Sequence, residues 1–479
     1  MAVLTTPGFD LNPAPSKVAL QTNYITNFNF LNQYLSDTYE KEFERYGNRT
    51  VSGFLRMVGA EMPSNSDLIK WAEQGRLHTK YTDCNADSAP GGAAAHTFTV
   101  TLPAGVSTAA LRVGQTVMIS ANAGASTLSN KAVVTTGSST PSGAGGTFTF
   151  SVKYYEATQN FPQNTTCTVF VYGSEFAKGT DTMVGSLEAQ DNFFENKPII
   201  LKDTYSVNGS DMAQIGWVEV TTENGATGYL WYLKSEHETR LRFDDYLETS
   251  MIEAVPAAVG SGAAADLGVP DATVGSAQGA GSDGIFYVVN TRGNVFQGIP
   301  TTLAEFDTII QRLDKQGSIE ENVIFVNRDF SFAIDDMLAA QNSYGAGGTS
   351  YGLFDNDEEM ALNLGFRGFR RGYDFYKSDW KYLNDPTMRG GLNSGKVDGL
   401  LVPAGSTTVY DQIMGKNAKR PFLHVRYRAS ETEDRRYKTW ITGSAGGAAN
   451  SSIDKMQVNF LSERAVCTLG ANNFFLFRD

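Results

Sequence analysis

The sequence predicts an α+β fold that carries an inserted all-β module. Three observations support this class. A long helix is indicated over Gly228–Ala254, residues 85–175 have a composition typical of short strands, and residues 285–340 alternate strand and helix signals. The chain therefore combines a helix-centred part, an α/β part and a separate β-rich part.

The predicted long helix has no Gly or Pro after Gly228, and Val255-Pro256 ends it. Thr227 can act as its N-cap. A helix of this length would span roughly 40 Å, which suits a backbone on which other elements lie. An ordinary amphipathic surface helix is the alternative. The apolar side chains that recur near a helical period are those of Leu233, Phe243, Leu247 and Met251.

Length and composition indicate a folded protein of several domains. The chain has 479 residues, enough for two to four domains, and 41% of them are hydrophobic. The 48 glycines favour many loops and β-structure. A net charge of −13 argues against a nucleic-acid binder, which needs a basic surface.

The cysteines and the N-terminal residues give no sign of metal binding or export. Cys84, Cys167 and Cys467 have no metal-ligand spacing; the first two could lie near each other, but free thiols are expected. The first residues lack the pattern of a signal peptide. No run of 18 apolar residues occurs, so no membrane span is expected and synthesis in a cytoplasm is the default.

The N-terminal part is expected to begin with an extended arm over residues 1–24, where three prolines disfavour a helix. Residues 27–46 read as a helix that stops at Gly47, and residues 65–73 as a second, short helix. An alternating strand follows over residues 77–83.

Residues 85–175 are rich in Ala, Gly, Ser, Thr and Val, with few charges. Short β-branched runs alternate with Gly/Ser/Pro clusters, which predicts a small antiparallel sandwich or barrel. A disordered Thr/Ala-rich loop is the alternative, disfavoured by the regular alternation in Thr147–Val152. The expected strands are Thr97–Leu102, Gln115–Ser120, Ala132–Thr136, Thr147–Tyr154 and Cys167–Tyr172.

Strands predicted at residues 197–207 and 215–220 follow the inserted module. With the strand before the module, they form a protruding loop that leads into the long helix. Residues 285–340 alternate predicted strands and helices, and Glu305 completes a capping box with Thr301 or Thr302. The elements predicted after the long helix are a strand at 285–289, helices at 302–316 and 328–340, and strands at 321–326, 372–382, 399–403, 422–427, 438–442, 456–465 and 473–478.

Three catalytic or nucleotide-binding motifs occur in unsuitable contexts. The GxGxxG at 279–284 precedes a predicted strand, whereas a dinucleotide site needs a helix there. The GxxxxGK that begins at Gly390 is followed by Val397, which has no hydroxyl for Mg²⁺. The GxSxG around Ser350 follows a glycine-rich loop, and His424 is expected to be a strand residue. The sequence therefore predicts no enzyme and no cofactor.

Metal sites are also not expected. The acidic run at 355–359 lacks the spacing of a calcium loop and reads as a solvated loop. His237 stands between two glutamates without a second histidine, so a zinc helix is disfavoured.

An Arg-aromatic segment at 366–373 contains Arg367, Arg370 and Arg371. Single-strand nucleic-acid binders interleave these residue types. In an acidic chain an Arg–carboxylate surface, within or between subunits, is the favoured interpretation, and a solvated loop is the third.

The order of arm, two-stranded loop, long helix, α/β part and returning β-tail resembles the major capsid proteins of tailed bacteriophages (Caudoviricetes), with the Hong Kong 97-type phage capsid fold. The C-terminal Val458–Val466, followed by Gly470–Phe474, is similar to the tail of such proteins and resembles that of the crAss-like group. The resemblance covers most of the chain outside residues 85–175.

The resemblance implies a domain assignment. Residues 1–62 would be the N-terminal arm with its helix. Residues 63–84 and 176–226 would form the extended loop, and residues 85–175 an inserted β-sandwich or barrel-like domain. The peripheral domain with its spine helix would take 227–314 and 416–479, and the axial domain 315–415.

The implied function is that of a structural protein that self-assembles as hexamers and pentamers into an icosahedral capsid enclosing packaged double-stranded DNA. Expected partners are other copies of the chain, with portal, scaffold and minor capsid or decoration proteins. Packaged DNA would lie close to the shell without specific contacts, and no membrane would be involved. The protein would be assembled in the host cytoplasm and located in the virion. The alternative is another virion surface, tail or adhesin component whose inserted β-domain binds a host glycan.

Assembly candidates follow from the same resemblance. The apolar side of the long helix is expected to pack on the returning strands near Phe460 and Phe474, while its charged side faces solvent or a neighbouring subunit. Lys197 and Lys202 lie on the presumed loop, but no motif marks either as a crosslinking residue. The full set of candidates is Leu233, Phe243, Leu247, Met251, Arg367, Arg370, Arg371, Phe460 and Phe474.

Overall fold

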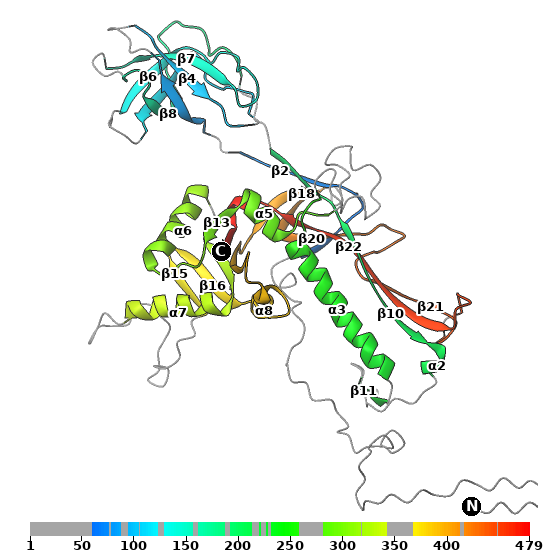
Figure 1. Cartoon of the computed structure of the whole chain (residues 1–479). Helices are drawn as coiled ribbons and strands as arrows, with labels where there is room; N and C mark the ends of the chain where they lie inside the picture. The colour runs from blue at the N-terminus through cyan, green and yellow to red at the C-terminus, as the bar shows by residue number, and fades with distance from the viewer. Residues whose placement is uncertain are drawn as a thin grey trace, which may run out of the picture. The chain divides into compact units, whose positions relative to one another are not determined.

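The computed structural model describes most of the chain from residue 60 onward (Figure 1). The predicted arm and first helix, the GxSxG motif and the acidic run lie outside the described residues. These residues are 60–75, 78–87, 94–104, 106–122, 129–156, 161–186, 192–212, 220–221, 227–228, 231–257, 281–317, 319–342, 367–411, 416–447 and 449–479.

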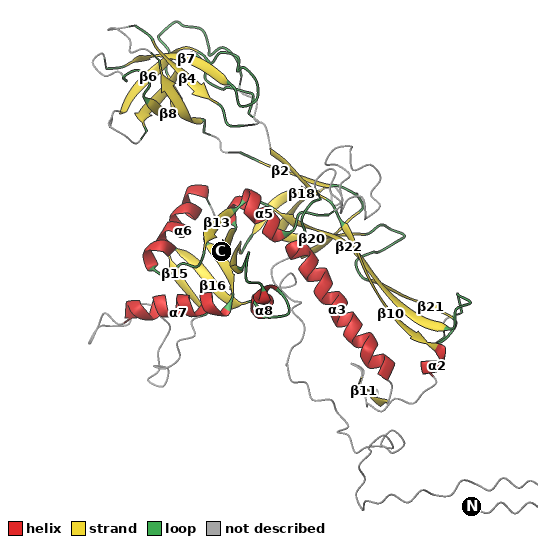
Figure 2. Ribbon diagram, viewed as in Figure 1, coloured by secondary structure: helices red, strands yellow, loops and turns green. Residues whose placement is uncertain are grey.

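The chain divides into two compact units. Of the described residues, 201–249 and 437–462 belong to one unit, called the spine unit below. The second, called the main unit, contains 53–200, 250–436 and 463–479. Helices and strands occur in both units, which agrees with the predicted α+β class (Figure 2).

A closed barrel of six antiparallel strands lies in the main unit, in the order β3-β4-β7-β6-β5-β8. Strand β7 alternates exposed and buried residues, so that Phe148, Phe150 and Val152 fill the interior. Of the two predicted forms, sandwich or barrel, the strands adopt the barrel. Their bounds are β3 Lys80–Ala86, β4 His96–Thr101, β5 Gln115–Ala121, β6 Ser129–Thr136, β7 Thr147–Tyr154 and β8 Thr166–Ser174.

The predicted boundary between residues 84 and 85 falls inside β3. The segment at 80–84, assigned to the extended loop from its composition, is therefore a barrel strand. Its later residues turn inward: Cys84 and Ala86 are fully buried in the barrel core. The change in composition does not mark this boundary. The outward-facing residues of a strand are polar in any half-exposed sheet, so they do not reveal which sheet the strand joins.

His96 is a buried polar residue at the start of β4. Its side chain is 0% exposed, and its Nδ1 lies 2.6 Å from the hydroxyl of Tyr154. Burial lowers the pKa of His96, because the cation would lose its hydration inside the barrel, while nearby Asp87 acts in the opposite direction. The neutral imidazole is therefore the form that suits the folded barrel.

The barrel is expected to lose stability as pH falls below about 6.5, the usual pKa of an unfolded histidine. In that range the unfolded chain takes up a proton that the folded barrel excludes. Amide hydrogen exchange of residues 96–101, compared at pH 7.5 and 5.5 after correction for intrinsic rates, measures the loss. His96→Gln should flatten the dependence, and an equal slope in the variant would contradict the assignment.

A six-stranded mixed sheet forms the second part of the main unit, in the order β13-β23-β17-β14-β16-β15. β14 pairs in parallel with β16 and antiparallel with β17. The strands are β13 Asn294–Gln297, β14 Glu321–Val326, β15 Gly368–Arg371, β16 Tyr373–Asp379, β17 Val397–Pro403 and β23 Phe475–Arg478. The accompanying helices are α5 Ile285–Arg292, α6 Leu303–Gln316, α7 Arg328–Asn342 and α8 Lys381–Asn384.

One core joins the helices α6 and α7 to this sheet. Phe306 of α6 contacts Phe375 of β16 with ring centroids 5.1 Å apart, and Phe330 of α7 contacts Phe477 of β23 at 4.8 Å. The predicted capping box on α6 is confirmed. The Thr302 side chain accepts a hydrogen bond from the backbone amide of Glu305, and the Glu305 side chain accepts one from the backbone amide of Thr302.

The strand predicted at 285–289 is wrong, because these residues begin helix α5. Ile285, Phe286, Val288 and Val289 are all buried. A short apolar run buried on every side has no period that separates strand from helix. The GxGxxG at 279–284 therefore precedes a helix, and the reason given for rejecting it is wrong.

The α/β sheet also differs from the predicted axial range, 315–415. It includes β13 and β23, which lie before and after that range, and the boundary at residue 315 falls within α6. The cause is strand pairing over long sequence distances: Phe475 and Leu476 of β23 pair with Leu401 and Leu400 of β17. Such pairings leave no local signal in the sequence.

Smaller sheets complete the main unit. β1 (Ala60–Ser64) pairs in parallel with β20 (Leu423–Arg428), whose other edge pairs with the end of β22 (Lys455–Thr468). β1 thus crosses the predicted arm boundary at 62. The remaining pairs are β2 Ile69–Glu73 with β9 Asn192–Asn196, and β18 Ser406–Asp411 with β19 Lys416–Pro421; η4 Arg389–Gly391 and η5 Ala471–Asn473 are short 3₁₀ turns.

The helix predicted at 65–73 is wrong, since β2 is a strand. Its residues Ile69 and Trp71 point to one side and pack near Ala465 and Cys467 of β22. Lys70 pairs with Glu195 of β9 at 3.1 Å. Cross-strand pairing thus overrides the local N-cap signal that suggested a helix.

The spine unit contains most of helix α3 (Trp231–Glu253), together with strand β21 (Lys438–Gly443) and the first part of β22. β21 pairs antiparallel with β22 from Lys438–Leu461 to Gly443–Met456. Most of β10 (Ile199–Asn208) also belongs here; it is a neighbour of β22 in the sheet. The other elements are α2 Gly209–Met212, β11 Val220–Thr221 and β12 Thr227–Gly228.

Candidate assembly site

The apolar side of α3 packs on the returning strands, as predicted. The ring centroid of Phe243 lies 5.7 Å from that of Phe460 and 5.4 Å from that of Tyr437. Phe243 is 0% exposed. Leu247, Met456 and Val458 belong to the same cluster, with Leu201 of β10 partly buried against it.

The other predicted apolar candidates lie elsewhere. Phe474 does not join this core: it is buried in the main unit directly before β23, and its carbonyl accepts from the Asn294 amide at 3.0 Å. Met251 is buried near the end of α3, in the part that belongs to the main unit. The side chain of Leu233 lies outside the described residues.

The expected charged face of α3 is only partly solvent-facing. Arg242 is half-exposed and pairs with Asp203 of β10 at 3.1 Å, within the spine unit. Asp245 and Glu248 are buried, at 8% and 5% exposure, which corrects the prediction that they face solvent. The helix is therefore covered over more of its circumference than its partial apolar stripe indicates.

The end of α3 is held by a polar cluster in the main unit. Tyr382 of α8 donates to Glu253 at 2.6 Å, and Arg389 reaches the same carboxylate at 3.0 Å. Burial, helped by the hydrogen bond to Glu253, raises the pKa of Tyr382 well above its usual range. The phenol therefore remains a donor at all physiological pH values.

The two-stranded ribbon of β2 and β9 is attached at its base by an arginine. The guanidinium of Arg292, at the end of α5, lies 4.1 Å from the ring centroid of Phe194 and 5.7 Å from that of Trp71. Burial lowers the pKa of Arg292, opposed by Glu73 and Asp283 nearby. Aromatic rings from both strands thus hold one cation.

Asn196, at the end of β9, is the second attachment. Its amide donates to the carbonyls of Val466 at 2.6 Å and Asp283 at 3.0 Å, and its oxygen accepts from the Ser282 hydroxyl. Asn196 is 4% exposed, so the desolvated amide is fully engaged. These contacts fix the direction in which the ribbon leaves the sheet.

Exposed apolar side chains occur on the opposite side of the ribbon and on other segments of the chain. Phe193 of β9 is 75% exposed, and Ile200 at the start of β10 is 53% exposed. In the spine unit, Trp440 and Ile441 of β21 and Ile453 are also exposed. Large apolar side chains on extended strands are typical of surfaces that become covered by a partner.

A network of arginines around β1 was missed by sequence reasoning. Glu61 of β1 contacts Arg436 and Arg464, the latter at 3.4 Å and only 7% exposed. Glu463 pairs with Arg435 at 2.7 Å, and Arg428 contacts Asp67. The partners of Glu61 and Asp67 lie more than 350 residues away in the chain, which explains the omission, since no spacing rule relates such partners.

Two of the three predicted arginines form ion pairs within the chain. Arg371 makes a bidentate contact with Asp307, with Nη2 2.7 Å from Oδ2, and Arg370 lies 3.2 Å from Asp374. The hydrogen bond from Arg371 lowers the pKa of Asp307. Arg367 is exposed on the same edge of the sheet. The predicted Arg–carboxylate surface is thus present within the subunit for Arg370 and Arg371.

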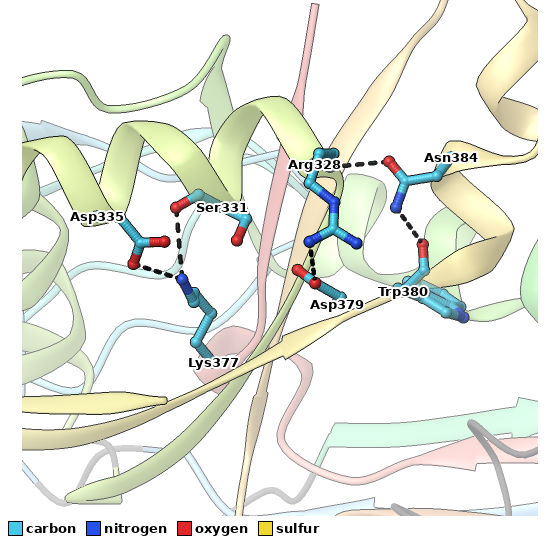
Figure 3. A network of polar contacts seen from close by, with 7 residues as sticks. All are labelled: Arg328, Ser331, Asp335, Lys377, Asp379, Trp380 and Asn384. Carbon is cyan, nitrogen blue, oxygen red and sulfur yellow. Dashed lines mark hydrogen bonds and ion pairs between the residues drawn. The ribbon is translucent and has the colours of Figure 1, made fainter. Parts of the chain in front are cut away.

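A polar network joins α7 to β16 (Figure 3). Lys377 reaches Asp335 at 2.5 Å and the Ser331 carbonyl at 3.5 Å, and both charged groups are about nine-tenths buried. At the start of α7, Arg328 pairs with Asp379 at 2.6 Å and donates its amide to Asn384 at 2.8 Å. The network fixes the helix on the sheet and contains no nucleophile–base pair.

The described residues offer no metal-holding group and no phosphate loop at the GxxxxGK segment. No group of three or more His, Cys, Asp and Glu side chains is placed to hold a metal ion in that part of the chain. The GxxxxGK segment is followed by strand β17, whereas a phosphate loop needs a helix. Within the described residues, no helix is both long and apolar enough to cross a membrane.

Comparisons by sequence yield no match to a family model or to a curated protein. By structure, the chain is similar to one from Microbacterium phage Oxtober96, at 8% identity and a TM-score of 0.37, covering 94% of this chain and 97% of that one. A capsid structure of the cyanophage P-SCSP1u gives 8% identity and 0.35, covering 64% and 80%. An encapsulin complex from Synechococcus elongatus gives 11% identity and a TM-score of 0.32, covering 60% of this chain and 77% of that one.

Proposed function

We propose that this chain is a structural protein that assembles as hexamers and pentamers into an icosahedral shell around packaged phage double-stranded DNA. The observation that carries the proposal is the ribbon of β2 and β9. One of its faces packs on β22, while the other presents Phe193 to solvent. A two-stranded ribbon is marginal in water without a hydrophobic partner on its faces. A second copy of the chain supplies that partner.

The distribution of the exposed apolar groups supports a large interface. Phe193 and Ile200 lie on the ribbon and the start of β10, and Trp440 and Ile441 lie on β21. Extended strands bury little against their own subunit and much against neighbours, as obligate interfaces of more than about 2,000 Å² require. A net charge of −13 also suits a wall that must not hold packaged DNA.

We propose domain bounds that follow the ends of the strands. The extended loop takes 63–79 and 175–226, with the inserted barrel at 80–174. The axial domain takes the mixed sheet with α6 and α7. The peripheral domain keeps the spine helix α3 with β21 and β22, while β23 joins the axial sheet.

Electron microscopy of the expressed chain tests the proposal directly. Hexamers, pentamers or closed shells are expected at micromolar concentration. A monomer that persists at high concentration, with native hydrogen-exchange protection in the barrel and the mixed sheet, would count against it.

Phe193→Asp is expected to block assembly without unfolding the subunit. The side chain is 75% exposed, so its replacement should change the free energy of unfolding by no more than about 0.5 kcal/mol. At an interface, losing a buried aromatic anchor and burying a charge costs about 2 kcal/mol or more in each contact. Sedimentation velocity measures the distribution of monomers and assemblies.

Val113→Asp is the matched control, because Val113 is 50% exposed but belongs to the inserted barrel and not to the ribbon. This variant should assemble like the wild type. If Phe193→Asp assembles as well as the wild type, the ribbon is not part of the interface between copies.

The barrel supports a second candidate function, binding of a host glycan by a virion surface, tail or adhesin protein. Phe170 and Tyr172 of β8 are exposed neighbours, with ring centroids 6.4 Å apart, and Lys131 lies 5.8 Å from the Tyr172 ring. Exposed aromatic rings beside a polar group suit a sugar ring. Replacing residues 80–174 with a short Gly/Ser linker should leave assembly intact if the barrel is a decoration, whereas an adhesin would lose glycan binding.

A further inference from the structure

Two cysteines face each other inside the barrel. Cys84 of β3 and Cys167 of β8 are directly opposite in the antiparallel register, and both are 0% exposed. Opposed residues of an antiparallel pair project their side chains to the same face of the sheet. Both sulfurs therefore belong to the same packed core.

We propose that Cys84 and Cys167 form a site of covalent modification, a cross-strand disulfide that ties the first strand of the barrel to the last. The inference is independent of shell assembly and concerns the barrel alone. A disulfide here would join the strand by which the chain enters the barrel to the strand by which it leaves.

The register satisfies the main geometric requirement. Opposed Cα atoms in an antiparallel pair are about 4.5–5.5 Å apart, within the roughly 4.4–6.8 Å that a disulfide spans. At present each thiol makes a weak contact with a carbonyl: Cys84 Sγ lies 3.6 Å from the Tyr81 oxygen, and Cys167 Sγ lies 3.5 Å from the Thr165 oxygen. Formation of the S–S bond would replace these two contacts.

Reduced thiols at this site are slow to react. Burial, together with neighbouring Cys167, raises the pKa of Cys84 to about 12, and burial raises the pKa of Cys167 to about 11. Asp83 and the Tyr154 hydroxyl also lie near the pair. Since the thiolate is the nucleophile, the bond forms mainly during local opening of β3 and β8.

The oxidant is a small disulfide such as glutathione disulfide. One barrel thiol loses its proton and attacks a glutathione sulfur, which releases one glutathione and leaves a mixed disulfide. The second thiolate then attacks the bound protein sulfur, forms the Cys84–Cys167 bond and releases the other glutathione. Two protein thiols are oxidised and one glutathione disulfide is reduced to two thiols, so atoms and electrons balance.

Cys467 provides an internal control. It is buried on β22, where its Cα partner is His424, away from the barrel core. No cysteine other than Cys467 remains to pair with either barrel thiol. Selective oxidation of the barrel pair therefore leaves Cys467 as the one reduced thiol per chain.

The test uses the full chain, held for days in glutathione disulfide just below the melting temperature of the barrel. Free thiols are then blocked and peptides mapped without reduction. We expect one crosslinked species, with Cys84 joined to Cys167 and a mass lower than the two peptides by two hydrogen atoms, while Cys467 is blocked. The melting temperature of the barrel should rise by about 5 °C or more, and thiol reduction should reverse the rise.

Three results would overturn the proposal. One is the absence of the crosslink while hydrogen exchange shows that β3 and β8 open during the incubation. The second is a mixture of all three pairings, as an unfolded chain would give. The third is a crosslink that leaves the melting temperature unchanged or lower. Cys167→Ala should abolish both the crosslink and the rise, and should leave Cys84 blocked.

Discussion

Replacing Phe243 with aspartate is expected to unfold the core of the spine unit and abolish assembly. Phe243 is 0% exposed and contacts both Phe460 and Tyr437. The substitution removes an aromatic ring and places a carboxylate in an apolar cluster, so a loss of more than about 4 kcal/mol is expected. Hydrogen exchange of β21 and β22, followed by electron microscopy, measures both effects.

Tyr246→Asp is the matched control on the same helix. Tyr246 is 46% exposed, so the carboxylate of an aspartate at this position stays hydrated. The substitution should therefore change the free energy of unfolding by no more than about 0.5 kcal/mol. If Phe243→Asp folds and assembles as well as Tyr246→Asp, the role of α3 as a structural spine is wrong.

Replacing Lys377 with methionine is expected to destabilise the α/β sheet by about 3 kcal/mol. Lys377 and Asp335 are both about nine-tenths buried, with 2.5 Å between Nζ and Oδ1. The variant leaves the Asp335 carboxylate desolvated without its lysine, and the cost of an uncompensated buried charge exceeds the net contribution of an intact pair. Urea denaturation followed by hydrogen exchange of α7 and β16 measures the loss.

Two comparisons sharpen this prediction. The double variant Lys377→Met, Asp335→Leu should recover most of the stability, because it removes both buried charges. Arg370→Met breaks a pair with Asp374 in which the arginine is 75% exposed, and should change stability by less than about 1 kcal/mol. Equal losses in Lys377→Met and Arg370→Met would show that burial of the pair has no effect.

Patterns within one element predicted the structure best. The alternation in Thr147–Tyr154 places β7, and the apolar spacing of Phe243 and Leu247 identifies the buried side of α3. The Thr302–Glu305 capping box marks the start of α6. Each of these signals involves residues that are close together in the chain, so it can be recognised without knowledge of the tertiary contacts.

Interactions between distant segments escaped prediction. The ion pairs of Glu61 with Arg436 and Arg464 form only because β1 and β22 flank β20. Asp245 and Glu248 looked solvated from their charge alone, yet they are buried. The strand β2 and the helix α5 were assigned to the wrong class, because their partners β9 and β23 lie far away in the chain.

Local patterns in the sequence are sufficient to predict the α+β class, the β-rich composition of the barrel strands and the apolar side of the spine helix. Closure of the inserted strands into a barrel, the pairing of Cys84 with Cys167 and the exposure of Phe193 are known only from the folded chain. The reason is physical. Periodicity records which side of an element is apolar, but strand partners and uncovered faces depend on chain segments that meet only after folding.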